Sequence, residues 1–339
     1  MKALLVGGTG VISTSVVLRL LEKNWDVTIL TRGKTPLPEK MQGRVRQVTA
    51  DIADEAAVEK ALLGEKYDAV CDFILFDPMQ AQRDIRLFRD KTAQYVFISS
   101  ASAYHKPVLK LPITEDTPLH NPFWQYSHLK AQCEKVFFDA YRESGFPITV
   151  VRPSHTYCER TLPVQIHGGH GPWVVMKRML EGKSVPVACD GETLWTATTA
   201  EDFAVYFCGL LGNEKAIGEA FHITSDESLT WNRMYEIIAG HVGGVFKPCY
   251  VPAHTLAACR QYDYRGALLG DKAYTVMFDN SKVKAVTGIS DHVCTPFTEG
   301  AKRSVQYYLE HPEIRREDPA FAAFCDQLQQ LMDEITAKL

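Results

Sequence analysis

The sequence predicts an α/β fold with a doubly wound parallel sheet and a smaller C-terminal region that binds substrate. Through the first half of the chain, short apolar runs alternate with longer stretches of helical periodicity. Strands and helices that alternate in this way form a parallel sheet with right-handed crossovers. A glycine-rich turn at residues 7–13 directly follows the first apolar run. In sheets of this kind, ligands bind at the carboxyl ends of the strands.

The elements of the first half follow from these patterns in order. The apolar runs predict strands over residues 2–6, 25–30, 44–50, 69–75, 95–100 and 148–153. The periodic stretches predict helices over residues 13–23, 54–63, 79–90 and 125–144.

The pattern loosens in the second half of the chain. We expect a helix over 174–181, a strand over 221–224 that returns to the main sheet, and a packing helix near the C-terminus. We therefore place a nucleotide-binding domain at 1–157 and a substrate-binding region at 158–339, with segments near 190–225 returning to the main fold.

Composition narrows the class of protein. The chain has 339 residues, a formal net charge of −4 and no basic domain, so binding to nucleic acid is not expected. Nine irregularly spaced cysteines indicate reduced thiols, most of them core residues, in a cytoplasmic protein. No apolar run approaches the roughly 18 residues that a membrane span requires.

The turn that follows the first strand carries a dinucleotide fingerprint, Gly7-x-x-Gly10-x-x-Ser13. The first glycine permits the tight turn, the second lets the backbone approach a pyrophosphate, and a small third residue keeps the helix close to the sheet. The N-terminus of that helix then faces the phosphates. We expect the cofactor to contact both glycines and three neighbours in the turn, Thr9, Val11 and Ile12. The alternative is a glycine-rich turn without a ligand.

The end of the second strand bears on which dinucleotide binds. An enzyme that uses NAD usually has an acid here to hold the ribose hydroxyls, whereas this chain has Thr31 and Arg32. Because a guanidinium pairs well with a phosphate, we expect NADP to be preferred over NAD. The alternative is that Arg32 is a solvated turn residue. Asp51 and Ile52, after the third strand, are expected beside the adenine.

Three residues form the candidate catalytic set. Tyr126 and Lys130 lie four positions apart on a predicted helix and therefore share one face. A nearby ammonium lowers the pKa of a phenol, which can then exchange a proton with a substrate oxygen while hydride moves. Ser100 lies where the fifth strand ends and can donate a hydrogen bond to the same oxygen. The pair alone is weak evidence, since a surface tyrosine and lysine often show this spacing.

Taken in order, these motifs resemble the extended short-chain dehydrogenase/reductases, the NAD(P)-dependent epimerase/dehydratase family. The resemblance covers about residues 1–225 and includes Asp51, the SSASAY stretch and VVRPS at 150–154. It implies that Tyr126 is the acid/base, that Lys130 tunes it and holds the nicotinamide ribose, and that Ser100 binds the substrate oxygen. It also implies that Pro153 and His155 lie near the nicotinamide, and that the tyrosine/lysine helices pair in a homodimer.

The chain departs from the family pattern at Ser13, at Thr31–Arg32 and at residues 71–78, where a small residue is usual near the cofactor. These features are similar to an atypical branch that includes chloroplast stem-loop RNA-binding proteins, some of which have lost catalytic residues. This chain keeps all three.

The resemblance implies hydride transfer at a secondary alcohol or ketone of a sugar-like or nucleotide-linked small molecule. Ala101 follows Ser100 where the sugar dehydratases have assisting acids, so epimerisation or simple reduction remains, and Arg32 favours reduction. The alternative is a non-catalytic nucleotide- or RNA-binding protein with the same Rossmann-type fold.

Other candidate residues have simpler interpretations. His167 and His170 lie in a glycine-rich loop without a third ligand nearby, so we expect no metal site. Asp202 is expected to anchor or cap a helix. Glu115 and Asp116 are expected to be solvated loop acids.

Overall fold

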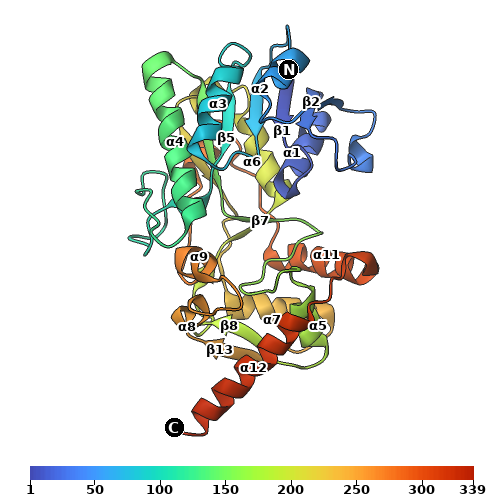
Figure 1. The fold of residues 1–339 in the computed structure, drawn as a ribbon, viewed down its shortest axis with the longest axis vertical. Coiled ribbons are helices and arrows are strands. Elements are labelled where there is room, and N and C mark those ends of the chain that lie inside the picture. The colour runs from blue at the N-terminus through green and yellow to red at the C-terminus, as the bar shows by residue number, and fades with distance from the viewer.

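The computed structural model describes all 339 residues, and its centre is a seven-stranded, wholly parallel sheet (Figure 1). The strand order is β11-β6-β5-β4-β1-β2-β3, so the order reverses between β1 and β4. The strands are β1 (Lys2–Val6), β2 (Asp26–Thr31), β3 (Arg46–Thr49), β4 (Ala69–Asp72), β5 (Tyr95–Ile98), β6 (Ile148–Pro153) and β11 (Ala220–Ile223).

Helices cover both faces of the sheet because its strands are apolar on both sides. Alternate residues of β1 face opposite ways: Ala3 and Leu5 join one core, and Leu4 and Val6 join the other. The first face is covered by α1 (Val11–Glu22) and α6 (Ala200–Leu210). The second is covered by α2 (Glu55–Ala61), α3 (Pro78–Phe88) and α4 (Gln125–Ser144). This is the doubly wound Rossmann arrangement that the sequence predicts.

A third core of 39 buried residues belongs mostly to the C-terminal region, below the sheet in Figure 1. A parallel pair of strands, β8 (Val185–Ala188) and β13 (Pro248–Val251), lies within it. Its helices are α5 (Trp173–Leu180), α7 (Trp231–Val242), α8 (Ala253–Ala257), α9 (Arg265–Ala267), α11 (Phe297–Glu310) and α12 (Pro319–Thr336).

Short elements connect the two regions. β7 (His155–Tyr157) pairs in parallel with β10 (Ala197–Thr199), and β9 (Leu194–Trp195) pairs antiparallel with β12 (Leu229–Thr230). α10 (Ser281–Thr287) packs against α6 and β11.

The main differences from the sequence expectation are at strand ends. β4 stops at Asp72 instead of residue 75, because the Asp72 carboxylate accepts the Ile74 N–H at 2.6 Å and turns the chain. β5 stops at Ile98 because Ser100 caps a short 3-10 turn with its hydroxyl. The predicted strand over 221–224 is β11, which joins the sheet beside β6.

The C-terminal helix packs along only part of its length. Phe321, Phe324 and Leu328 are buried, whereas Leu331 and Ile335 are about half exposed, at 47% and 51%. Figure 1 shows the end of α12 projecting from the molecule. None of the helices combines the length and apolar character needed to cross a bilayer. Six of the nine cysteines are buried, and all nine are free thiols.

Candidate functional site

Ser13, which replaces the third glycine, holds the turn between β1 and α1 through two hydrogen bonds. The Ser13 hydroxyl donates to the Gly7 carbonyl and accepts the Gly10 N–H, both at 2.8 Å. Gly7 has φ +81°, and a Cβ there would lie 2.5 Å from Cγ2 of Ile74. Glycine is therefore required at position 7 by conformation and by space. Ser13 keeps the turn compact, so its presence does not break the fingerprint.

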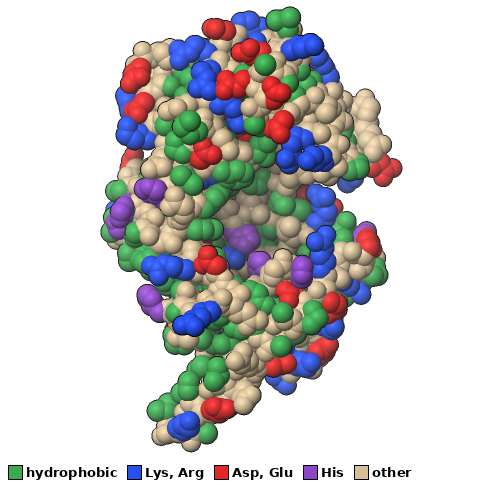
Figure 2. Space-filling model, in the orientation of Figure 1, with side chains coloured by type: hydrophobic (Ala, Val, Ile, Leu, Met, Phe, Trp, Pro, Cys, Tyr) green, Lys and Arg blue, Asp and Glu red, His purple; other side chains and the backbone are tan.

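A groove of about 770 Å³ runs along the carboxyl ends of the strands. Figure 2 shows the face hollowed between the sheet and the C-terminal region. Ile74 and Phe76, at the place where the family usually has a small residue, also line the groove. Most of the predicted site residues line it: Gly7, Thr9, Gly10, Val11, Ile12, Arg32, Asp51, Ile52, Tyr126, Lys130 and Pro153.

The groove's far end is basic. Arg32 and Lys34 line it, both are exposed, and neither forms an ion pair. Thr31 uses its hydroxyl to accept the Gly33 N–H at 3.2 Å, which shapes the turn. The carboxylate of Asp51, which also lines the groove, accepts the Ala53 N–H at 3.0 Å. The end of β2 therefore offers cations, and no carboxylate, to a ribose.

At the near end, Lys130 is fixed by the backbone. Its ammonium donates to the carbonyls of Leu75 and Ile98, at 2.6 and 2.7 Å. These carbonyls follow β4 and end β5, so the sheet itself positions the charge. The Lys130 ammonium lies 5.7 Å from the ring centre of Tyr126 and 4.6 Å from that of Phe76. The two residues of the predicted pair thus meet in the groove.

The expected lowering of the Tyr126 pKa is wrong for this structure. Burial raises the pKa of the Tyr126 phenol, and the neighbouring Ser100 hydroxyl opposes the shift only in part. Burial also lowers the pKa of Lys130 to about 8, with nearby acidic groups opposing this shift. The ammonium is occupied by two carbonyls and lies toward the face of the ring, so it does not offset the desolvation of the phenol.

A second cavity, of about 350 Å³, adjoins the groove. It shares Tyr126 and Pro153 with the groove, so the phenol stands where the two spaces meet. Ser100 and His155 line this second cavity and not the groove. The remaining lining residues are Ala101, Ser102, Trp124, Ser154, Ala267, Asp271, Lys272 and Phe278. Those from 267 onward were missed by sequence reasoning, since no local motif connects them to Tyr126.

The two predicted residues in the second cavity have distinct environments. The Ser100 hydroxyl lies 2.8 Å from that of Ser102, which lies 2.6 Å from that of Ser127. Burial lowers the pKa of His155 to about 3, so its imidazole is neutral. The His155 ring packs edge-on to Trp195, which is itself buried. His155 therefore faces the space beyond the phenol rather than the groove.

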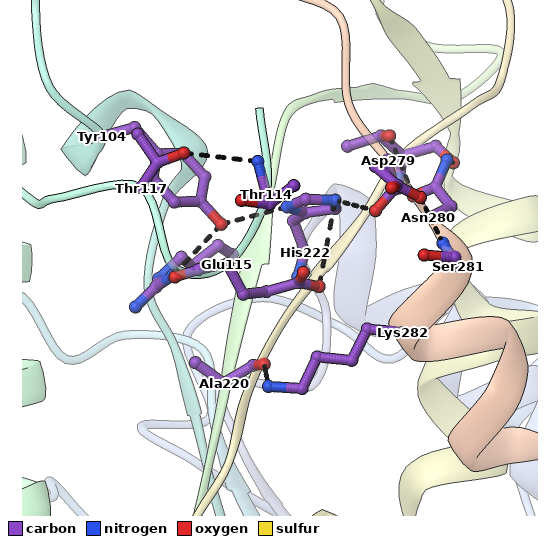
Figure 3. A network of polar contacts seen from close by, with 12 residues as sticks. Tyr104, Thr114, Glu115, Thr117, Ala220, His222, Asp279, Asn280, Ser281 and Lys282 are labelled. Atoms are coloured by element: carbon purple, nitrogen blue, oxygen red, sulfur yellow. Dashed lines mark hydrogen bonds and ion pairs between the residues drawn. The ribbon is translucent and has the colours of Figure 1, made fainter. Parts of the chain in front are cut away.

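A buried polar network behind the cavities connects the sheet to the C-terminal region (Figure 3). His222, on β11, contacts the Tyr104 hydroxyl through Nδ1 at 3.0 Å and the Asp279 carbonyl through Nε2 at 2.7 Å. Burial lowers the pKa of His222 to about 4. Glu115 accepts the backbone N–H of His222 at 3.2 Å. The expectation that Glu115 is a solvated loop acid is therefore wrong, whereas Asp116 is exposed.

Several of the possible metal ligands form hydrogen bonds within the protein. His167 bonds through Nδ1 to the Gly168 carbonyl at 2.7 Å. Elsewhere Asp202, His292 and Cys294 place their ligand atoms within 4.8 Å of one another. The Asp202 carboxylate there contacts His292 Nε2 at 2.9 Å and accepts the Thr295 N–H at 2.8 Å. Asp202 thus anchors a loop to α6, in line with its predicted role as an anchor.

A groove lined by a glycine-rich turn and by a tyrosine/lysine helix is the arrangement of the short-chain dehydrogenase/reductases, and we place the chain in that class. Residues 3–84 and 79–224 match the model of the NAD dependent epimerase/dehydratase family. The chain belongs to this family, whose members include NAD-dependent epimerases, dehydratases and reductases.

Two curated relatives differ in their described roles. The 2′-dehydrokanamycin reductase of Streptomyces kanamyceticus is 28% identical over 262 residues, which cover 76% of this chain and 71% of the reductase. The chloroplast stem-loop binding protein of 41 kDa b of Arabidopsis thaliana is 26% identical over 259 residues, which cover 73% of this chain and 64% of that protein.

Solved structures share the fold. The UDP-glucose 4-epimerase of Bifidobacterium longum, in complex with NAD+ and UDP, superposes with a TM-score of 0.72 at 18% identity. The match covers 92% of this chain and 99% of the epimerase.

Proposed function

We propose that this protein transfers hydride between a nicotinamide dinucleotide and a secondary alcohol or ketone of a sugar-like substrate, with Tyr126 as the acid/base. The observation that carries this proposal is the position of the phenol, where the 770 Å³ groove meets the 350 Å³ cavity. A group bound in either space has the Tyr126 hydroxyl at its boundary. The proton can then move at the substrate oxygen while the hydride moves at the carbon that bears this oxygen.

The neighbouring residues have separate roles in this scheme. Lys130, held by two carbonyls, presents a positive charge to the nicotinamide ribose. Ser100, on the cavity side, donates to the substrate oxygen that Tyr126 protonates or deprotonates. A bound cofactor supplies or accepts the hydride.

The groove fits such a cofactor. The Gly7–Gly10 turn leaves the backbone open to a pyrophosphate at the N-terminus of α1. Asp51 and Ile52 line the part expected to hold the adenine. We propose NADP as the preferred dinucleotide, because Arg32 and Lys34 stand unpaired where a 2′-phosphate would lie.

Simple reduction is the favoured reaction and epimerisation the alternative. An externally supplied NADPH suits a reductase, and the similarity to 2′-dehydrokanamycin reductase supports the same direction. Ala101, next to Ser100, offers no acid for elimination, which argues against dehydration. We also propose a cytoplasmic homodimer that pairs its α4 helices.

A second candidate is a nucleotide- or RNA-binding protein without turnover. The similarity to the chloroplast stem-loop binding protein favours it. The net charge of −4 and the retained Ser100, Tyr126 and Lys130 weigh against it.

Replacement of the phenol tests the proposal. Purified protein is given NADPH or NADH with a panel of keto sugars, and cofactor oxidation is followed. We expect Tyr126→Phe to lower kcat by about 10²-fold to 10⁴-fold, because the proton donor is lost, with cofactor affinity unchanged. The exposed Tyr250→Phe is the matched control. Full turnover by Tyr126→Phe would refute the mechanism, and salt-sensitive RNA binding without turnover would favour the second candidate.

A further inference from the structure

The second cavity has an unusual charge distribution for a site that would bind a phosphorylated ligand. Its lining includes one carboxylate, Asp271, and one ammonium, Lys272. The Lys272 ammonium donates to the carbonyls of Val164 and Gln165, at 2.9 and 3.3 Å, so two of its three N–H groups are already committed. No arginine lines this space. A diphosphate would thus find a single ammonium on the cavity wall, with one N–H group left to donate.

Asp271, by contrast, has acceptor capacity to spare. The nearest cation is Lys106, whose ammonium lies 3.7 Å from Oδ1, an ion pair longer than a hydrogen bond. Lys106 is fully buried behind the carboxylate, whereas the Asp271 side chain keeps 21% of its surface exposed. The carboxylate therefore has a protein cation on its inner side and an open side that faces the cavity.

The segment that carries Asp271 is held firmly against the catalytic helix. A Cβ on Gly266 would lie 2.2 Å from Cδ1 of Trp124, and a Cβ on Gly270 would lie 2.7 Å from Cβ of Trp124. These two glycines let the segment approach the indole that directly precedes α4. Asp271 lies in a π-helical turn at Leu268–Lys272. Such turns often occur at functional sites.

Asn121 fixes the same segment to the catalytic loop. Its buried amide donates to the Ser102 carbonyl at 2.7 Å and to the Gly270 carbonyl at 2.6 Å. One side chain thus joins the loop that carries Ser100 to the residue before Asp271. The distance between the reacting phenol and the carboxylate is set by structure, which suits a group that orients a substrate.

We propose that Asp271 is a specificity-determining residue that binds an ammonium group of the substrate, and that the substrate is an amino-substituted carbohydrate without phosphate. This inference rests on the proposed function and narrows its substrate class. A partly exposed carboxylate with free lone pairs binds an ammonium through charge-assisted hydrogen bonds. The neutral His155 and the serine hydroxyls supply hydrogen bonds to sugar hydroxyls.

A matched pair of sugars tests the inference. The probes are the β-1,4 disaccharide of glucosamine and its N-acetylated form, which has the same skeleton without the charges, and UDP-glucose. Affinities are measured by calorimetry on protein saturated with NADP+. We expect the charged disaccharide to bind at least about tenfold more tightly than the acetylated one, and UDP-glucose not to displace it. Asp271→Asn should abolish that preference.

Two further variants keep the test interpretable. Asp271→Asn leaves Lys106 buried without a counter-charge, so the double variant with Lys106→Met, which removes both charges, is measured as well. Asp263→Asn, at an exposed carboxylate on the same segment, is the control and should keep the preference.

The possible outcomes separate this inference from the proposed function. Equal affinity for the two disaccharides, no binding of either, tighter binding of UDP-glucose, or a preference that survives Asp271→Asn would each overturn the inference. Binding of NADPH to the same variants without NADP+, followed by its fluorescence, and oxidation of NADPH by keto sugars report on the proposed function independently.

Discussion

The groove and the second cavity meet at one phenol, yet they are assembled in different ways. The groove takes its key features from contiguous turns that follow single strands: Gly7–Ser13 after β1, Thr31–Lys34 after β2, and Asp51 and Ile52 after β3. The second cavity joins residues as far apart in sequence as Ser100 and Asp271, which are 171 positions apart. The turns that line the groove are therefore encoded locally in this chain, whereas the second cavity depends on long-range packing.

The largest expected effect comes from a substitution in the locally encoded groove. Gly7→Ala should abolish dinucleotide binding and lower the free energy of unfolding by about 2–4 kcal/mol, because the new methyl would be strained at φ +81° and collide with Ile74. Calorimetry with NADPH and denaturant titration measure the two effects.

Gly43→Ala is the matched control for that variant. Gly43 has φ +70° with nothing within 4 Å of an added Cβ, so only the backbone strain of about 1–2 kcal/mol should appear. If the two variants behaved alike, the close approach of Ile74 would have no role in shaping the groove.

The contacts between the two regions should respond to acid. His222 has a pKa of about 4 in the folded protein, below its ordinary value, so the unfolded chain binds a proton first as the pH falls. The contribution of His222 to the free energy of unfolding is complete above about pH 6.5. It declines as the pH drops toward 4, by up to about 3 kcal/mol. Denaturant unfolding across this pH range measures the decline.

His222→Gln should flatten that part of the profile, since the titrating group is gone. His254→Gln, at an exposed histidine, should leave the slope as in the wild type. Parallel profiles for His222→Gln and the wild type would show that the buried network of Figure 3 does not carry the acid sensitivity.

The smallest expected effect concerns the basic end of the groove. Arg32→Ala should weaken NADPH binding by about tenfold and leave NADH binding nearly unchanged, because only NADPH carries the 2′-phosphate. Fluorescence titrations with both cofactors measure the difference. Arg44→Ala, at an exposed arginine that does not line the groove, is the control. An equal loss for both cofactors would contradict the NADP preference.

Local encoding explains which features could be predicted. Apolar runs and glycine placement were sufficient to predict the strands of the sheet and the turns after β1, β2 and β3 that line the groove, because each depends on a few neighbours in sequence. The placement of His155 in the second cavity depends on the direction that the chain takes between β6 and β7. No short sequence pattern predicts this direction. Asp271 and Trp124 were missed because their proximity results from Gly266 and Gly270, glycines with no recognisable motif around them.

The pKa of Tyr126 could not be predicted for a related reason. The spacing to Lys130 fixes which helix face the two share, but not which way the ammonium points. In the structure the ammonium donates to two carbonyls outside its own helix, that of Leu75 beyond β4 and that of Ile98 at the end of β5. Burial of the phenol then determines the direction of the shift.

The ties of Lys130 to Leu75 and Ile98 also affect how descent from this family is judged. An inactive descendant that lost this lysine would leave two buried carbonyls without donors and would lose stability as well as catalysis. Selection for folding alone would preserve the lysine. A retained Lys130 is therefore weaker evidence for an active enzyme than a retained Tyr126. The Tyr126 hydroxyl forms no comparable hydrogen bonds that stabilise the fold.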